Sequence, residues 1–138
     1  MIAEWREGMS TGDAEIDSQH RELLRRLNDL LQGVRALKGS EEIGKLLWFL
    51  KGYVRKHFRA EEELQLNCGF PGYLAHKAEH EAFYLEVKRL ESLYAAQGAS
   101  TVVIVSAIHA MCDWLRNHFK QTDKSMIEFV RQVAASMV

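Results

Sequence analysis

Four segments of the sequence repeat apolar residues at steps of three and four, the spacing that gives an α-helix one buried face. Short breakers that contain glycine, serine and the only proline separate these segments. Four amphipathic helices of this length must bury their apolar faces against one another. The predicted helices run from near Asp17 to Gly39, from Ser40 to the CGFPGY segment, from about Leu74 to Tyr94, and through TVVIVSAI and Leu115 to His118, followed by a short amphipathic helix around Met126 to Val133.

The TVVIVSAI segment is rich enough in β-branched residues to suggest a strand. However, Ile104, Ile108 and Met111 continue a helical period through it, and no partner strand is visible elsewhere, so we interpret it as helix. Because helices joined by short connections pack as antiparallel neighbours, the predicted fold is all-α. We expect an up-down-up-down four-helix bundle with a polar N-terminal arm and a short C-terminal helix, formed by residues 1–138 as a single domain.

Charge and composition exclude several classes of partner. The 18 Lys and Arg residues nearly balance the 19 Asp and Glu residues and are scattered, so we expect no nucleic acid partner. The first twenty residues hold no apolar run that could serve as a secretory signal, and the longest apolar run, TVVIVSAIHAM, is too short to span a bilayer. We therefore expect a cytoplasmic protein without membrane insertion. Cys68 and Cys112 lie far apart without a C-x-x-C spacing, which predicts idle thiols rather than a zinc ribbon or a disulfide.

Five of the six histidines fall on the apolar stripes of the predicted helices: His20, His57, His76, His80 and His118. Two carboxylates accompany them, because Glu61 follows His57 by one helical turn and Asp123 follows His118 by five residues. The sixth histidine, His109, lies off its stripe, and we expect it to face solvent or a helix edge. The sequence thus predicts five imidazoles that point into one bundle core.

The free-energy cost of burying these polar side chains has to be offset by hydrogen bonds or by a bound ion. A single histidine on an apolar face is usually hydrogen-bonded within the core, so one such residue would indicate little. Burying five imidazoles and a carboxylate costs several kcal/mol for each unpaired group, against a net stability of about 5 to 15 kcal/mol for a small domain. A metal ion that binds neutral imidazole nitrogens and carboxylate oxygens would compensate all of them at once. A purely structural bundle without metal is the alternative.

The spacing of His118 and Asp123 constrains the backbone geometry of the fourth helix. A step of five residues leaves two side chains about 140° apart on an ideal α-helix, so they would point in different directions. If both residues bind one centre, the helix must end, kink or widen between them.

The motifs that carry these residues, IDSQHREL, HFRAEE, HKAEHEAF and WLRNHFKQTD, resemble those of the hemerythrins in order and spacing, and specifically the bacterial hemerythrin-like proteins. The resemblance covers nearly the whole chain, from Trp5 onward. It implies a non-haem di-iron centre (Fe2+/Fe3+) with a bridging oxo or hydroxo group inside the bundle. The five imidazoles would be terminal ligands, Glu61 and Asp123 would bridge the two iron ions, and one coordination position would stay open for dioxygen. No side chain is expected to act as a catalytic acid or base.

The resemblance also implies which side chains line an oxygen pocket. Leu23, Trp114 and Leu115 lie within one turn of ligands, although each could equally be an ordinary core residue. Gln65 departs from the bacterial family, which commonly carries a methionine four residues after the position of Glu61. If Gln65 reaches the centre, it could donate a hydrogen bond there or admit water and change the rate of oxidation to the ferric state. If it points outward, nothing follows.

The predicted function is reversible dioxygen binding, as an oxygen carrier, store or supplier. The alternatives are an oxygen or redox sensor, a di-iron peroxidase and an iron-buffering protein. An enzyme is less favoured, because the sequence lacks the E-x-x-H motif of ferritin-like di-iron oxidases and the H-E-x-x-H motif of zinc hydrolases. Beyond dioxygen, the expected partner is an oxygen-consuming enzyme or a signalling protein. The lack of an attached output domain favours a carrier, store or diffusible sensor.

Overall fold

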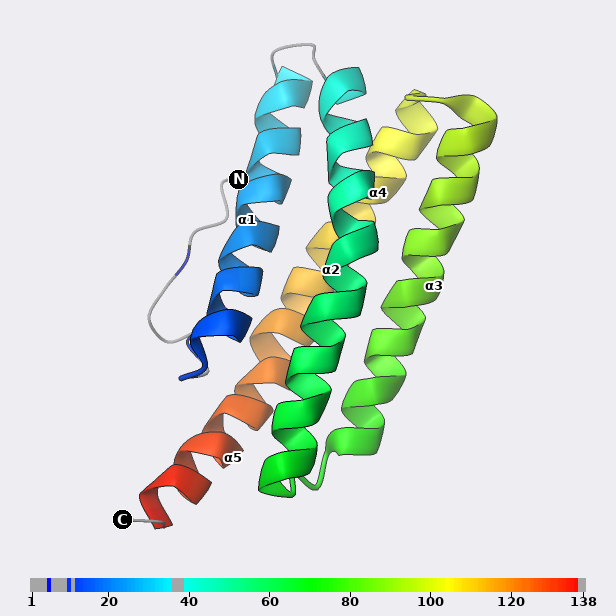
Figure 1. Ribbon diagram of the computed structural model, residues 1–138. Coiled ribbons are helices and arrows are strands. Elements are labelled where there is room, and N and C mark those ends of the chain that lie inside the picture. Colours follow the sequence, from blue (N-terminus) through cyan, green and yellow to red (C-terminus); the bar gives the residue numbers. More distant parts are fainter. Residues whose placement is uncertain (1–4, 6–9, 11, 36–38, 137–138) are drawn as a thin grey trace.

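The protein folds into a bundle of helices, as a computed structural model shows (Figure 1). The structure describes residues 5, 10, 12–35 and 39–136, without the side chains of residues 35, 39 and 119–124. Its elements are α1 (Ala14–Arg35), α2 (Gly39–Cys68), α3 (Tyr73–Gln97), α4 (Thr101–Asp113), the π-helix η2 (Trp114–Thr122) and α5 (Asp123–Ser136). The described residues contain no strand, so the all-α prediction is confirmed.

Helices α1 to α4 lie side by side, and consecutive helices run in opposite directions (Figure 1). Helix α2 packs on both α1 and α3, and α4 contacts all three of the others. These contacts close the bundle around one core, as the four apolar stripes require. Helix α5 continues beyond α4 and η2 toward the lower end of the bundle in Figure 1 and still contacts α2.

Helix α1 begins earlier than the sequence predicts. The carboxylate of Asp13 accepts hydrogen bonds from the backbone amides of Glu15 and Ile16, both at 3.0 Å, so Asp13 caps the helix. The predicted start near Asp17 is therefore wrong. Asp17 lies inside the helix, where its carboxylate accepts a hydrogen bond of 2.6 Å from the Ser10 hydroxyl. Both residues can cap a helix, and the one whose oxygen reaches the free amides decides where the helix begins.

The β-branched TVVIVSAI segment is helical, as predicted, and forms most of α4. The hydroxyl of Ser100 accepts a hydrogen bond from the amide of Val103 at 3.2 Å and caps the helix. Just before it, Gly98 ends α3 with a φ of 64°, a left-handed conformation that glycine adopts without steric cost. Local capping and the buried stripe thus outweigh the strand preference of the valines.

The fourth helix widens at the predicted place. Helix α4 passes directly into η2, whose π-type hydrogen bonds join residues five apart rather than four. Residues five apart therefore lie close to one face in this segment. His118 lies within η2 and Asp123 is the first residue of α5, so the backbone meets the demand that their spacing makes. The Asp123 side chain itself lies outside the described part of the chain.

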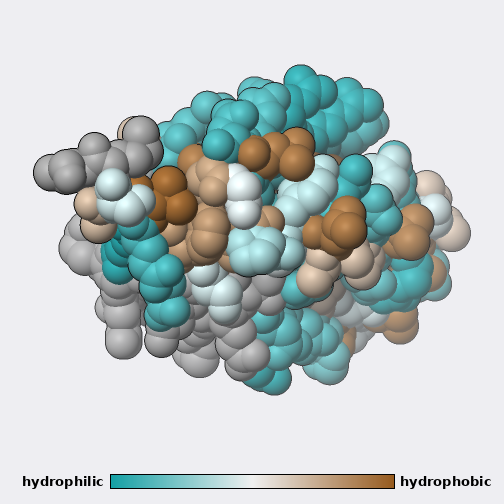
Figure 2. Space-filling view, turned by 90° about the horizontal axis from the view of Figure 1, so that it is seen from below, coloured by the Kyte–Doolittle hydropathy of each residue, from teal (hydrophilic) through white to brown (hydrophobic). Residues whose placement is uncertain are grey.

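The apolar core and the histidines occupy different levels of the bundle. Leu27, Leu30, Ile43 and Leu46 fill the level near the α1–α2 connection, where each is at most 1% exposed. The buried histidines lie toward the opposite end, which Figure 2 shows from outside. Hydrophobic side chains form several small groups on this end, separated by hydrophilic ones. The described residues of this end therefore do not form one continuous apolar face of the kind that marks a large interface.

The sequence also makes predictions about membrane-spanning helices and about the two cysteines. Within the described ranges, no helix combines the length and the apolar character that crossing a bilayer requires. Cys68 and Cys112 are both half-buried and free, as expected from their spacing.

Candidate metal centre

One buried carboxylate lies at the centre of five buried imidazoles. Helix α1 supplies His20, α2 supplies His57 and Glu61, α3 supplies His76 and His80, and η2 supplies His118. All six residues are at most 1% exposed. The remaining histidine, His109, is exposed on α4, as expected from its position off the apolar stripe.

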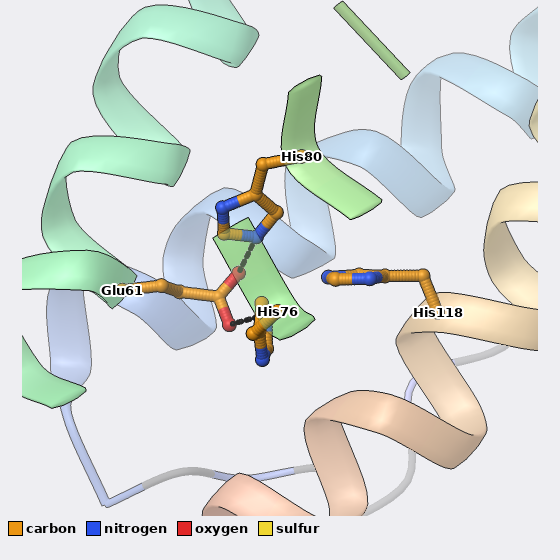
Figure 3. A group of neighbouring side chains, drawn as sticks. All are labelled: Glu61, His76, His80 and His118. Carbon is orange, nitrogen blue, oxygen red and sulfur yellow. Dashed lines mark ion pairs between the residues drawn. The ribbon is translucent and has the colours of Figure 1, made fainter. Parts of the chain in front are cut away.

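The donor atoms of these six residues form two groups that share Glu61. In one group the donors of Glu61, His76, His80 and His118 lie within 4.8 Å of one another (Figure 3). In the other group the same limit holds for His20, His57 and Glu61. A carboxylate with two oxygens can bind an ion on each side, so the arrangement fits a pair of ions with Glu61 between them.

Most of the distances between Glu61 and the surrounding imidazoles suit ions better than hydrogen bonds. Glu61 Oε1 lies 3.8 Å from His20 Nε2 and 3.7 Å from His80 Nε2, and it also contacts His57 Nε2. Glu61 Oε2 lies 3.5 Å from His76 Nε2. Separations above about 3.2 Å are too long for good hydrogen bonds. Donor atoms that share one ion at bond lengths of about 2.1 Å lie about 3 to 4 Å apart, which matches this spacing.

Glu61 is ionised although it is fully buried. Burial alone would raise the pKa of its carboxyl group. The surrounding imidazoles of His57, His20 and His76 outweigh this effect and hold the pKa of the carboxyl group well below its usual value. A buried carboxylate that keeps its negative charge is the form that binds a cation.

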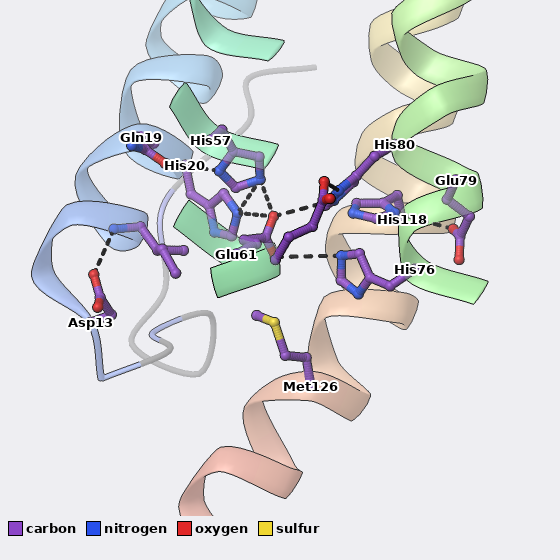
Figure 4. Close-up of polar contacts among 12 residues, drawn as sticks. Asp13, Gln19, His20, His57, Glu61, His76, Glu79, His80, His118 and Met126 are labelled. Atoms are coloured by element: carbon purple, nitrogen blue, oxygen red, sulfur yellow. Dashed lines mark hydrogen bonds and ion pairs between the residues drawn. The ribbon is translucent and has the colours of Figure 1, made fainter. Parts of the chain in front are cut away.

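Three of the imidazoles are oriented by side chains on their outer side, and Figure 4 labels two of these partners, Gln19 and Glu79. The oxygen atoms of these partners can only accept, so each ring donates through Nδ1–H and directs the lone pair of Nε2 toward Glu61. The pairs are His57 Nδ1 with Gln19 Oε1 at 3.1 Å, His80 Nδ1 with Glu62 Oε2 at 3.0 Å, and His118 Nδ1 with Glu79 Oε1 at 3.1 Å. This tautomer is the one that metal binding through Nε2 requires.

No motif of the sequence pointed to Gln19, Glu62 and Glu79 as functional residues. Each of them is adjacent in the sequence to a residue of the cluster, but it supports a histidine on the next helix. Gln19 on α1 contacts the histidine on α2, Glu62 on α2 contacts the one on α3, and Glu79 on α3 contacts the one on η2. A polar residue beside each expected ligand was the available signal, and the pairing itself depends on which helices are neighbours.

Aromatic rings stack on the same three imidazoles and hold their planes. Trp114 stacks on His118 with ring centroids 3.8 Å apart, and Phe58 stacks on His80 at 3.9 Å. Tyr53 stacks on His57 at 4.7 Å. With Nδ1 hydrogen-bonded and one face covered, each ring has little freedom to rotate.

The four residues expected near an oxygen pocket are all buried. Leu23 is fully buried one turn after His20, and Trp114 and Leu115 are buried beside His118. Gln65 is also fully buried, and its Nε2 donates a hydrogen bond of 3.1 Å to the Met126 sulfur. Gln65 therefore points into the bundle on the side of α2 that carries Glu61, and the outward alternative is excluded.

The available donor set fits the metal centre that the sequence predicts. Imidazole nitrogens and a carboxylate, without thiolate, suit iron, zinc or other first-row metals. His80 Nε2 is buried and has no hydrogen-bond partner among the described residues, which a bound cation would remedy. These residues could therefore hold two ions, whereas the role of Asp123 as a second bridge stays a prediction.

Replacing Glu79 by alanine is expected to weaken metal binding by about 10- to 100-fold, because His118 loses the partner that fixes its ring. Transfer of metal to a chelator, followed over time, measures the effect. Glu86→Ala is the matched control, since Glu86 lies on the same helix and pairs with Arg89 at the surface. Equal metal loss from both variants would show that the Glu79–His118 hydrogen bond has no part in holding the ion.

Comparisons with known proteins agree with this geometry. The family model described as "Hemerythrin HHE cation binding domain" matches residues 11–130. A bacteriohemerythrin from Methylococcus capsulatus is 33% identical over 108 residues, which cover 78% of this chain and 80% of the relative. One from Stenotrophomonas maltophilia is 28% identical over 127 residues, 92% of this chain and 80% of the relative. A hemerythrin-like protein from Naegleria gruberi is 27% identical over 119 residues, 86% of each chain.

Proposed function

We propose, from the premise that this chain belongs to the hemerythrin family, that its buried cluster holds two iron ions and binds dioxygen reversibly. The observation that carries this proposal is the position of Glu61, which is shared by two groups of buried imidazoles. His76, His80 and His118 would bind one iron, and His20 and His57 the other. Glu61, Asp123 and an oxo or hydroxo group would bridge them.

The unequal number of imidazoles supports an open coordination position on one side. Three histidines approach Glu61 in one group and two in the other. The ion held by His20 and His57 would have fewer protein ligands than the other ion, which would leave room there for dioxygen. Two ferrous ions would supply the two electrons that reversible capture of dioxygen takes.

The side chains around this position are suited to exclude water. Leu23 is fully buried one turn after His20, so it would form an apolar wall on the side of the open position. Trp114 and Leu115 are buried around His118 and would close the other side. Excluding water and stray protons slows the irreversible oxidation of the ions, which keeps binding reversible. The side chains would act by holding, orienting and shielding, so we propose a binding protein rather than an enzyme.

The proposed role is that of an oxygen carrier, store or supplier in the cytoplasm. Its ligand is dioxygen, and we propose an oxygen-consuming enzyme or a signalling protein as the recipient, with neither nucleic acid nor membrane as a partner. Stopped-flow measurement of oxygen dissociation tests this role. A carrier releases the gas completely and returns to its starting spectrum, whereas a scavenger or an oxidase consumes it and does not.

Replacing Gln65 by methionine is expected to slow oxidation of the iron to the ferric state by about tenfold, because the change removes a buried amide that can attract water to the core. Stopped-flow absorption of the oxygenated protein measures the rate. The control is Asn67→Met, an exposed position near the same end of α2. If the parent and the Gln65 variant oxidise at the same rate, the amide has no influence on the centre.

A further inference from the structure

A buried methionine faces the cluster and contacts an amide. Met126 on α5 and Gln65 on α2 are both fully buried. The Gln65 Nε2 atom lies 3.1 Å from the Met126 sulfur, and Gln65 follows Glu61 by one turn of α2. Figure 4 shows the Met126 side chain directed toward Glu61. The thioether is therefore directed toward the cluster, although it is closed off from solvent.

We propose that Met126 is a modification site, where hydrogen peroxide that reaches the cluster oxidises the thioether to a sulfoxide that Gln65 stabilises. The inference rests on the proposed function, because an oxygen-binding centre is what brings such an oxidant into this core. Peroxide enters from solution or forms when bound dioxygen is reduced and leaves.

The reaction is a transfer of one oxygen atom. A lone pair of the Met126 sulfur attacks one oxygen of hydrogen peroxide, an S–O bond forms and the O–O bond breaks. The proton on the transferred oxygen passes to the departing oxygen, which leaves as water. The sulfur loses two electrons and the peroxide gains them, so the step needs no other reactant.

Gln65 can donate a hydrogen bond to the sulfoxide and so stabilise the oxidised side chain in the core. A thioether is a weak hydrogen-bond acceptor, whereas a sulfoxide is polar and disrupts an apolar environment. The amide nitrogen of Gln65 already lies within hydrogen-bond distance of the sulfur and carries two N–H donors. Its Oε1 atom has no hydrogen-bond partner among the described residues, so the amide is free to turn toward the new oxygen.

Met111 provides an internal comparison. It is as fully buried as Met126, but it lies on α4 within the apolar core cluster of leucines and valines. Burial by itself would protect both sulfur atoms equally from an oxidant in solution. Selective oxidation of Met126 would therefore indicate that the oxidant acts from the cluster.

The test treats iron-loaded protein, whose iron content and oxygen-dependent spectrum have been measured, with hydrogen peroxide. Peptide mass spectrometry then compares sulfoxide at Met126 with sulfoxide at Met111. We expect Met126 to be oxidised about tenfold more than Met111. Comparable oxidation of both residues, or none at Met126, in protein that binds iron and oxygen would overturn this inference alone. A chain that binds no iron and leaves Met126 unoxidised would overturn the proposed function as well.

A variant separates the role of Gln65 from that of the thioether. In Gln65→Leu the sulfoxide at Met126 loses its hydrogen-bond donor, so oxidation should lower the Tm of the variant by several degrees more than that of the parent. Asn67→Leu serves as the control on the same helix. Equal shifts of Tm on oxidation in Gln65→Leu and in the parent would contradict the stabilising role of Gln65.

Discussion

Replacing Glu61 by glutamine is expected to reduce the iron content from two ions per chain to less than one. The substitution keeps the shape of the side chain but removes the negative charge that both groups of imidazoles share. Removing one partner of a buried charged pair costs roughly 3 to 5 kcal/mol, which corresponds to a loss of affinity of at least about 100-fold. Metal analysis of protein reconstituted with ferrous iron measures the effect.

The control for this substitution lies two residues away on the same helix. Glu63 is exposed, so Glu63→Gln changes the net charge by the same amount without touching the cluster. It should keep both ions. If Glu61→Gln also retained two ions with parental affinity, Glu61 would not be the bridge, and the arrangement of two groups around one carboxylate would need another explanation.

Removing the metal is expected to lower the Tm by on the order of 10 °C or more. A ligand that binds the folded chain alone stabilises it by about 4 kcal/mol when its free concentration is a thousand times Kd, and a domain of this size loses a few degrees of Tm for each kcal/mol. The physical reason is the burial of five imidazoles around Glu61. Bound ions would balance the negative charge of Glu61 and accept the lone pairs of the imidazoles. Calorimetry before and after chelation measures the shift.

Two controls make the metal experiment specific. Adding ferrous iron back should restore the Tm, which separates loss of metal from damage by the chelator. The variant His109→Ala removes an exposed histidine and should show the same shift as the parent. A Tm that is unchanged by chelation, in protein shown to have carried iron, would mean that the bundle satisfies its buried polar groups without metal.

The sequence was sufficient to predict the helices and the inward histidines, because both depend on local periodicity. Residues at steps of three and four share a helix face, so His57 and Glu61 had to join the stripe that includes Val54. The five-residue step between His118 and Asp123 predicted that the fourth helix ends, kinks or widens there, and η2 shows that it widens.

The contacts between helices could not be read from the sequence. Met126 contacts Gln65, a residue 61 positions away, and this pairing depends on how α5 leaves the bundle. The residues that hydrogen-bond the histidine Nδ1 atoms could not be predicted either, since a residue such as Glu62 could as well have faced solvent. The start of α1 at Asp13 rather than Asp17 was missed for a smaller reason, because two aspartates within one turn offer equivalent caps.

We propose that one buried carboxylate and five imidazoles hold two ions that bind dioxygen reversibly. The measurement to make is iron analysis combined with a visible absorption spectrum, on protein that is reduced without oxygen, then exposed to air, then returned to vacuum. We predict two irons per chain and a charge-transfer band that appears in air and disappears under vacuum. A folded chain without iron, or a band that decays to a permanent ferric spectrum, would contradict the claim.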